Sequence, residues 1–215
     1  TGIAASADSL TVKGLPSDFE LTVDNLSVLF NTASGTGATP IDWSALVTGN
    51  PLEDLAGAVT LAVSGDLTVN LGGYVLVAGH FDVQKSSHTD VDLGANGAAV
   101  DVELLTIDLV DVDLFVGVGG VFDTSVPGDY EVDATNGTGF FVDNADLYLA
   151  IASVTDPTPL DPPSDLRTWT GIAASADSLT VKGLPSDFEL TVDNLSVLFN
   201  TASGTGATPI DWSAL

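Results

Sequence analysis

The sequence predicts an all-β protein built as a tandem repeat, and three observations carry this prediction. Residues 1–46 recur letter for letter as residues 170–215, so the chain holds one period of 169 residues and the beginning of the next. The composition favours strands and turns, because 25 of the 30 acidic residues are Asp and there are 22 Gly and 10 Pro. Apolar and polar residues alternate with a period of two along residues 100–118, as they do on a strand.

Short apolar runs and the turn residues between them predict the elements of the first half of the period. Residues 7–30 indicate two strands joined by a turn at residues 15–18, and residues 31–40 indicate a loop of small residues. Trp43 follows this loop, and we expect it to anchor a hydrophobic corner. Residues 58–83 indicate a strand, a turn at residues 64–66 and a long second strand, after which residues 85–98 indicate a polar loop.

The second half begins with the clearest strand pattern, at residues 100–118. At about 3.3 Å per residue this strand would be roughly 60 Å long, so we expect a bend or bulge at residues 106–108. Residues 123–139 indicate a turn-rich loop, and residues 140–154 indicate the last strand. The Pro-rich residues 156–165 are expected to be extended and to form the seam between periods.

A weaker repeat lies inside the period. An apolar-Thr-β-branched-Asp/Asn pattern, or a close variant of it, begins at residues 21, 67, 105 and 140. We therefore expect a β-solenoid-like stack of about four β units per period, with β-sandwich modules in tandem as the alternative. In such a stack, Asp24, Asn70, Asp108 and Asp143 are expected to form a column with a spacing of about 4.8 Å.

The charge of the chain restricts its partners. The 30 acidic side chains face only four Lys or Arg, which gives a net charge of −26. Such a protein repels nucleic acid and anionic membranes, which bind through Lys and Arg. No apolar stretch is long enough for a membrane helix, and the absence of Cys excludes disulfides and thiolate metal sites. Divalent cations are the partners that this charge favours.

Clustered acidic residues are the candidate metal ligands. Residues two apart on a strand share a face, and Ca²⁺ is coordinated by carboxylate and carbonyl oxygens. The same residues are also typical of a solvated acidic face that keeps a protein soluble. Neither an EF-hand loop nor a Gly-Asp nonapeptide is present, so a Ca²⁺ site here would be irregular. The candidate Ca²⁺ ligands are Asp108, Asp111, Asp113, Asp143, Asn144 and Asp146.

No catalytic residue and no cofactor site is predicted. No Ser stands in a Gly-x-Ser-x-Gly turn, and His80 and His88 are the only histidines. No single carboxylate pair stands out for glycoside cleavage, so a polysaccharide hydrolase is the least favoured alternative. A carbohydrate-binding surface module is the nearer alternative, and it would present Tyr74, Tyr130 or Tyr148.

Four stretches resemble the repeat units of very large bacterial secreted proteins, which are β-strand-rich arrays described as adhesins or calcium-binding surface proteins. The stretches are LTVDNLSVLFN (21–31), VSGDLTVNLGGYVLVAGHFDVQKS (63–86), LLTIDLVDVDLFVGVGG (104–120) and RTWTGIAASADSLTVKGLP (167–185). The resemblance implies a cell-surface location and an array architecture, and it transfers no site residue. We therefore expect a structural segment of a stalk, fibre or adhesin shaft, stiffened by Ca²⁺, whose partners are neighbouring repeats and laterally associated copies.

Overall fold

The computed structural model describes residues 1–12, 16, 18–94, 97–126, 130–155, 165–185 and 190–212. Most of the expected Pro-rich seam, residues 156–164, lies outside these ranges, as does part of the expected turn at residues 15–18. No helix among the described residues is long and apolar enough to span a membrane.

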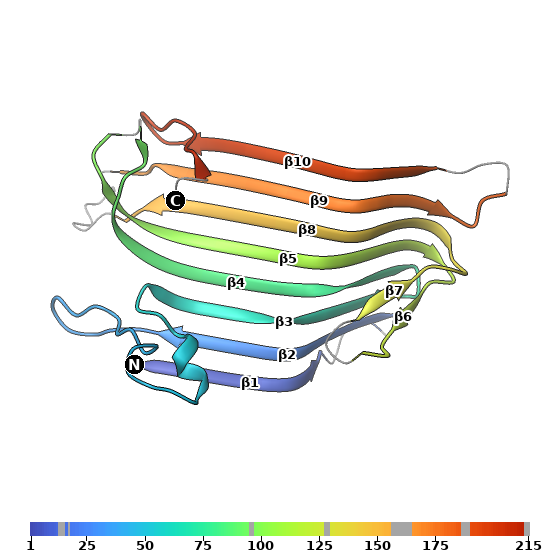
Figure 1. Cartoon of the computed structure of the whole chain (residues 1–215), viewed down its shortest axis with the longest axis horizontal. Coiled ribbons are helices and arrows are strands. Elements are labelled where there is room, and N and C mark those ends of the chain that lie inside the picture. The colour runs from blue at the N-terminus through green and yellow to red at the C-terminus, as the bar shows by residue number, and fades with distance from the viewer. Residues whose placement is uncertain are drawn as a thin grey trace.

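Eight long strands lie side by side in one antiparallel sheet, in the order β1-β2-β3-β4-β5-β8-β9-β10 (Figure 1). A two-stranded hairpin and a short 3-10 helix complete the regular structure of the described residues. The elements are β1 (Gly2–Thr11), β2 (Phe19–Asn31), η1 (Pro51–Asp54), β3 (Val59–Leu71), β4 (Val75–Val91), β5 (Val100–Val118), β6 (Val121–Asp123), β7 (Glu131–Asp133), β8 (Thr138–Val154), β9 (Thr168–Lys182) and β10 (Thr191–Ser203). The all-β class is confirmed, whereas a solenoid-like stack is not seen among the described strands.

Two sequence-based boundaries are wrong. The expected turn at residues 64–66 lies inside β3, and the chain turns instead at Gly72 and Gly73, whose φ angles of 61° and 73° suit glycine. Gly65 has a different role, because a Cβ there would lie 3.0 Å from Val23 Cγ1 on the neighbouring strand. The first half of the polar loop expected at residues 85–98 is strand, since β4 continues to Val91.

The expected column of four Asp and Asn residues is also wrong, because neighbouring strands run in opposite directions. Asp24 lies opposite Asp66, and Asn70 lies opposite Glu20. Asp108 lies between Asp82 and Tyr148, while Asp143 lies opposite Ser178. The Asp or Asn residues that end the repeated four-residue pattern therefore do not lie beside one another on neighbouring strands.

One face of the sheet is covered by loops, and we call it the cap face. Three small hydrophobic clusters lie under these loops. Trp43 packs with Leu29, Leu55 and Val59, which confirms the expected hydrophobic corner. The hairpin β6–β7 packs over Phe115 and Phe141 at one end of the sheet. The third cluster is formed by Leu93, Val102, Ala152, Trp169 and Ile210.

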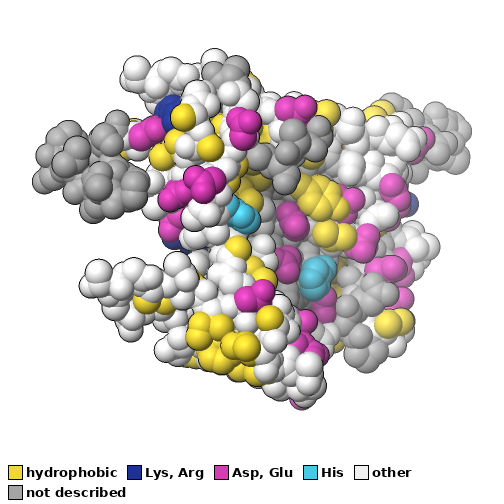
Figure 2. Space-filling model, turned by 60° about the vertical axis from the view of Figure 1, so that its left-hand side comes forward, with side chains coloured by type: hydrophobic (Ala, Val, Ile, Leu, Met, Phe, Trp, Pro, Cys, Tyr) yellow, Lys and Arg dark blue, Asp and Glu magenta, His cyan; other side chains and the backbone are white. Residues whose placement is uncertain are grey.

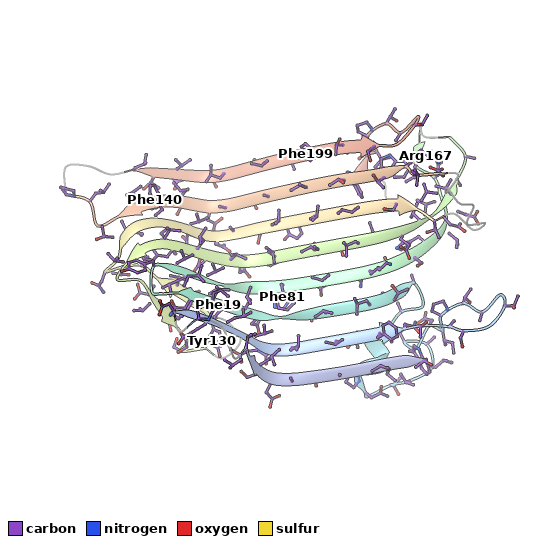
Figure 3. All side chains as sticks on the ribbon, turned by 180° about the vertical axis from the view of Figure 1, so that it is seen from behind. Phe19, Phe81, Tyr130, Phe140, Arg167 and Phe199 are labelled. Carbon is purple, nitrogen blue, oxygen red and sulfur yellow. The ribbon has the colours of Figure 1, made fainter. Side chains whose placement is uncertain are left out.

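The opposite face, which we call the back face, is mostly apolar and uncovered, and the Lys85–Glu103 ion pair also lies on it. One row of register partners crosses all eight strands and contains only Ala, Val, Ile, Leu and Phe: Ala5, Val28, Val63, Val83, Ile107, Leu149, Ile172 and Phe199. The corresponding row on the cap face is Ser6, Ser27, Ser64, Asp82, Asp108, Tyr148, Ala173 and Leu198. Seen from behind, no described segment crosses the strands that carry Phe81, Phe140 and Phe199 (Figure 3).

Candidate functional site

Four strands carry a polar residue with a left-handed backbone near their middle, and we call these positions the bulge row. They are Asn25 (φ 50°), Asp111 (φ 53°), Asn144 (φ 51°) and Asn194 (φ 53°). Asn and Asp adopt this conformation more readily than β-branched residues. The strand register shifts by one residue beside the first three of them. These shifts are β-bulges, and the expected bend at residues 106–108 therefore lies a few residues later, at Asp111.

The first part of the bulge row links three strands to the hairpin. Asn25 Nδ2 donates to Asp66 Oδ2 at 2.8 Å, and the other carboxylate oxygen of Asp66 lies 2.8 Å from His80 Nδ1. Tyr130, beside the hairpin, donates its hydroxyl to the Asp24 carboxylate. Burial and the negative charge of Asp24 raise the pKa of Tyr130. His80 lies within β4 in this polar cluster, and Figure 2 shows acidic side chains near the histidines.

The second part of the bulge row joins β5 and β8. Asp113 is 7% exposed, and its two carboxylate oxygens accept the backbone N–H groups of Val132 at 2.9 Å and Asn144 at 3.1 Å. The backbone N–H of Asp111 donates to Asp146 Oδ1 at 3.2 Å. The N–H groups of Asp111 and Asn144 are bulge donors that these carboxylates satisfy, whereas the N–H of Val132 belongs to β7 and ties the hairpin to Asp113.

Burial changes the pKa of two of these acids. Burial raises the pKa of Asp113, and the two backbone N–H donors only partly oppose that rise. Burial also raises the pKa of Asp108, with a further contribution from the charge of its register partner Asp82. Both groups therefore hold a proton more tightly than an ordinary Asp.

The structure brings five of the six predicted Ca²⁺ ligands to the two neighbouring bulges of β5 and β8. They are Asp111, Asp113, Asp143, Asn144 and Asp146, while Asp108 lies beside Asp82. Within the described ranges, no group of three or more Asp, Glu or His side chains is placed to hold a metal ion. The contacts of Asp113 and Asp146 are those of bulge-stabilising acceptors, and calcium binding stays a prediction.

A hollow of about 250 Å³ lies between the hairpin and the sheet. Five carboxylates and one ammonium group line it, from Asp113, Asp123, Glu131, Asp133, Asp143 and Lys182. Backbone and side-chain hydrogen bonds from Ser125 and Thr135 lower the pKa of Asp123 and of Asp133, respectively. No sequence pattern marks Asp123, Glu131 or Asp133 as site residues, because only the folding of the hairpin over β5 brings them to this hollow.

The duplicated segment adopts the same conformation in both copies. Gly2 lies opposite Asn31 in β1–β2, and the corresponding Gly171 lies opposite Asn200 in β9–β10. In the first copy, Trp43 Nε1 donates to Asn31 Oδ1 at 3.2 Å, and Asn31 Nδ2 donates to the Ile41 carbonyl at 2.8 Å. The second copy reproduces both bonds at the same distances, with Trp212, Asn200 and Ile210. Duplicated sequence therefore gives duplicated structure.

The two copies differ in what surrounds them. Ile210 is 6% exposed because it packs with Trp169, which ends the first period, whereas its counterpart Ile41 is 45% exposed. The difference is reversed on the other side of the segment. Leu29 is 9% exposed under Leu55, whereas its counterpart Leu198 is 84% exposed.

A second hollow, of about 520 Å³, ends at Leu198 and Trp212 on the cap face. Its other side-chain walls on this face come from β5, β8 and β9 and include Thr106, Asp108 and Tyr148. The three tyrosines considered for carbohydrate binding do not meet. Tyr74 lies in the turn after β3, Tyr130 contacts Asp24, and Tyr148 alone lines this hollow.

No protein-family model, curated protein or solved structure matches this chain. The fold and the two-copy comparison are therefore the observations from which a function is argued.

Proposed function

We propose that this chain is a structural segment of a larger extracellular repeat protein, in a stalk, fibre or adhesin shaft, and that it has no enzymatic role. One observation carries the proposal: the second copy of the repeated segment continues the sheet of the first period. Strand β9 pairs with β8 from Ser153 opposite Thr168 to Gly139 opposite Lys182. A period therefore contributes the six long strands β1, β2, β3, β4, β5 and β8, and the next period begins at the edge of β8.

This arrangement suits a mechanical role, because each period is joined to the next by a continuous backbone ladder. Side-chain contacts strengthen the junction. Trp169 is fully buried, and its Nε1 donates to the Thr208 carbonyl at 2.9 Å. Sheet extension takes the place of solenoid-like stacking as the way in which we expect successive periods to join.

Scattering experiments on one, two and three periods test the proposal. Six strands at about 4.8 Å each should lengthen the particle by roughly 30 Å per added period. Small-angle X-ray scattering measures this growth as the maximum dimension, and its increment approaches that value as periods are added, because the strands run along the longest axis of a short array. A maximum dimension that grows only as a compact globule of the same mass would contradict the shaft.

The uncovered back face supports lateral self-association of such segments into fibres. The eight strands have 10–19 residues each and together cover roughly 1,800 Å² at the standard strand spacings. A stable interface needs about 800 Å² from each partner, so this face has ample area for a second copy. The acidic rows lie on the cap face, and packing two back faces together therefore keeps those carboxylates apart.

Calcium stiffening is a further part of the proposal. The support is the net charge of −26 and the acidic hollow under the hairpin, which would both favour bound divalent cations. The extracellular location rests on the resemblance alone, and proteolytic shaving of intact cells that make the array would release its peptides if it is exposed there.

A further inference from the structure

We propose that strand β10, together with the end of the hollow at Leu198, is a docking site for a second copy of residues 51–71, the segment that forms η1 and β3. The donor is a further period of the same array, so this inference rests on the proposed function and names its contact. The first period supplies the template, because β2 has the same sequence as β10 and already binds this segment.

Side-chain burial shows what β10 lacks. On β2, Leu29 packs in one cluster with Leu55 and Val59, and Leu55 is fully buried. On β10, Leu198 pairs with Ala173 of β9, just as Leu29 pairs with Ala4 of β1. Leu198 is nevertheless 84% exposed. Removing a leucine side chain from water is favourable, so the exposed Leu198 offers an apolar surface that a docked segment would cover.

The Trp and Asn side chains beside Leu198 are already arranged like those beside Leu29. Trp43 donates its backbone N–H to the Leu55 carbonyl at 3.0 Å and its indole N–H to Asn31. Trp212 makes the same indole contact with Asn200. A copy of Leu55 placed over Leu198, as Leu55 lies over Leu29, would cover this end of the 520 Å³ hollow.

The backbone of β10 is shaped in advance for the incoming strand. On β2, the bulge at Asn25 accommodates β3, and Asn25 Nδ2 bonds to Asp66. Asn194 occupies the same place on β10 and has φ 53°, against φ 50° at Asn25, although no described strand pairs with the outer side of β10. A non-glycine residue in this conformation is uncommon, and here it matches the register of β3.

The register of the docked strand follows from the β2–β3 pairing. Val28 lies opposite Val63, Leu29 opposite Ala62 and Phe30 opposite Leu61. The copy should therefore place its Val63, Ala62 and Leu61 opposite Val197, Leu198 and Phe199. This register also brings the copy of Asp66 to the side-chain amide of Asn194.

A further period is the donor because another folded copy of this chain has no free segment to give. Its own η1 and β3 are held on its own β2, with Leu55 fully buried. Release of the segment would expose that cluster. The η1 and β3 residues of a following period can dock on β10 without leaving another cluster exposed.

Hydrogen–deuterium exchange tests the site. The 215-residue chain is compared with a chain in which Leu215 is followed by a second copy of residues 47–91. Docking should slow exchange of the outward amides of β10 by about tenfold or more, to the rates of the matching amides of β2. Unchanged exchange along β10 in the extended chain would overturn the proposal.

Three variants of the extended chain give the controls. Asn194→Val disfavours the left-handed backbone and should abolish the added protection, whereas Asn194→Gly keeps that backbone and should retain most of it. Gly65→Val in the added copy alone should block docking, because a Cβ added at Gly65 of β3 would lie 3.0 Å from Val23 Cγ1 and 3.1 Å from the Asp24 carbonyl. The counterparts of these two residues on β10 are Val192 and Asp193. Equal protection in all three variants would contradict the β3-like register.

These results are separate from those on the shaft. Protection of β10 in a particle that does not lengthen with added periods would leave the docking site standing and remove the shaft. A particle that lengthens with added periods but shows no protection of β10 would support the shaft and overturn the docking site.

Discussion

Asn144 Nδ2 lies 2.9 Å from Asp177 Oδ2, and this hydrogen bond joins the first period to the second. Asn144 belongs to the bulge of β8, and Asp177 belongs to β9 of the repeated segment. The counterpart of Asp177 in the first copy is Asp8, which lies on the exposed edge strand β1. The contact therefore exists in the second copy only, and Asp8 serves as the matched control for Asp177.

Asp177→Ala should lower the free energy of unfolding by about 0.5–1 kcal/mol, the usual value of one hydrogen bond. Asp8→Ala removes the same charge from the same sequence context and should change it by less than about 0.5 kcal/mol. Urea denaturation followed by circular dichroism measures both. Equal losses in the two variants would show that the Asn144–Asp177 bond contributes nothing to the junction.

The two leucines of the repeated segment should respond differently to truncation. Leu29→Ala removes a buried side chain from the cluster with Leu55 and should cost about 2–4 kcal/mol. Leu198→Ala changes a side chain that is 84% exposed and should cost less than about 0.5 kcal/mol. Thermal and urea unfolding of both variants provide the comparison, and similar losses would show that Leu198 is covered in solution.

The class of fold and the repeat were readable from the sequence, because both depend on local pattern and on identity between segments. The alternation in residues 100–118 predicted β5. Its apolar positions before the bulge at Asp111, such as Val102, lie on the cap face, and those after it, such as Val116, lie on the back face. The turn after β3 was misplaced because Ser64-Gly65-Asp66 has turn composition. Its glycine instead permits close approach of β2 to β3.

The candidate site was predicted in part for a similar reason. Five of the six candidate ligands meet because they lie on two strands that pair, and their spacing along each strand was visible. The partners of the bulge residues could not be predicted from the sequence. Asp66, His80 and Asp177 reach the bulge row only through strand register, which no local pattern specifies. Asn and Asp inside a strand pattern were the available signal for bulges.

The raised pKa of Asp113 predicts how stability depends on pH. The folded state holds this proton more tightly than the unfolded state does, since the folded pKa lies above the ordinary value of 3.8. The resulting stabilisation is fully present below about pH 3.8 and is lost as pH rises through the raised pKa. The free energy of unfolding of the Asp113→Asn variant should therefore fall less between about pH 4 and pH 7 than that of the unaltered chain.

Urea titrations at several pH values measure this difference. Asp133→Asn is the control, because Asp133 lines the same hollow and hydrogen bonds from Thr135 lower its pKa, so its carboxyl stays ionised between about pH 4 and pH 7. Its pH profile should follow that of the unaltered chain. Parallel profiles for all three proteins would show that Asp113 is not the group that holds the proton.

Divalent cations should stabilise the chain, and Ca²⁺ and Mg²⁺ should do so equally. The net charge of −26 favours any bound divalent ion, while the described residues contain no preformed group of three ligating side chains. EGTA should therefore lower the melting temperature of the calcium-loaded protein, and Mg²⁺ should restore it to the same value. A melting temperature unchanged by EGTA would remove calcium from the proposed function, and a larger effect of Ca²⁺ than of Mg²⁺ would indicate a selective site.

Self-association should depend on the back face and not on the cap face. Phe140 is 55% exposed on the back face beside Val116, which is 43% exposed, and a lysine there would place a charge inside a packed pair of sheets. Tyr148 is 44% exposed on the cap face and offers a matched position. Phe140→Lys should shift the protein toward monomer in sedimentation velocity by at least tenfold in dissociation constant, about 1.4 kcal/mol. Tyr148→Lys should leave the dissociation constant unchanged, and a monomer at every concentration for all three proteins would show that the back face does not bind a second copy.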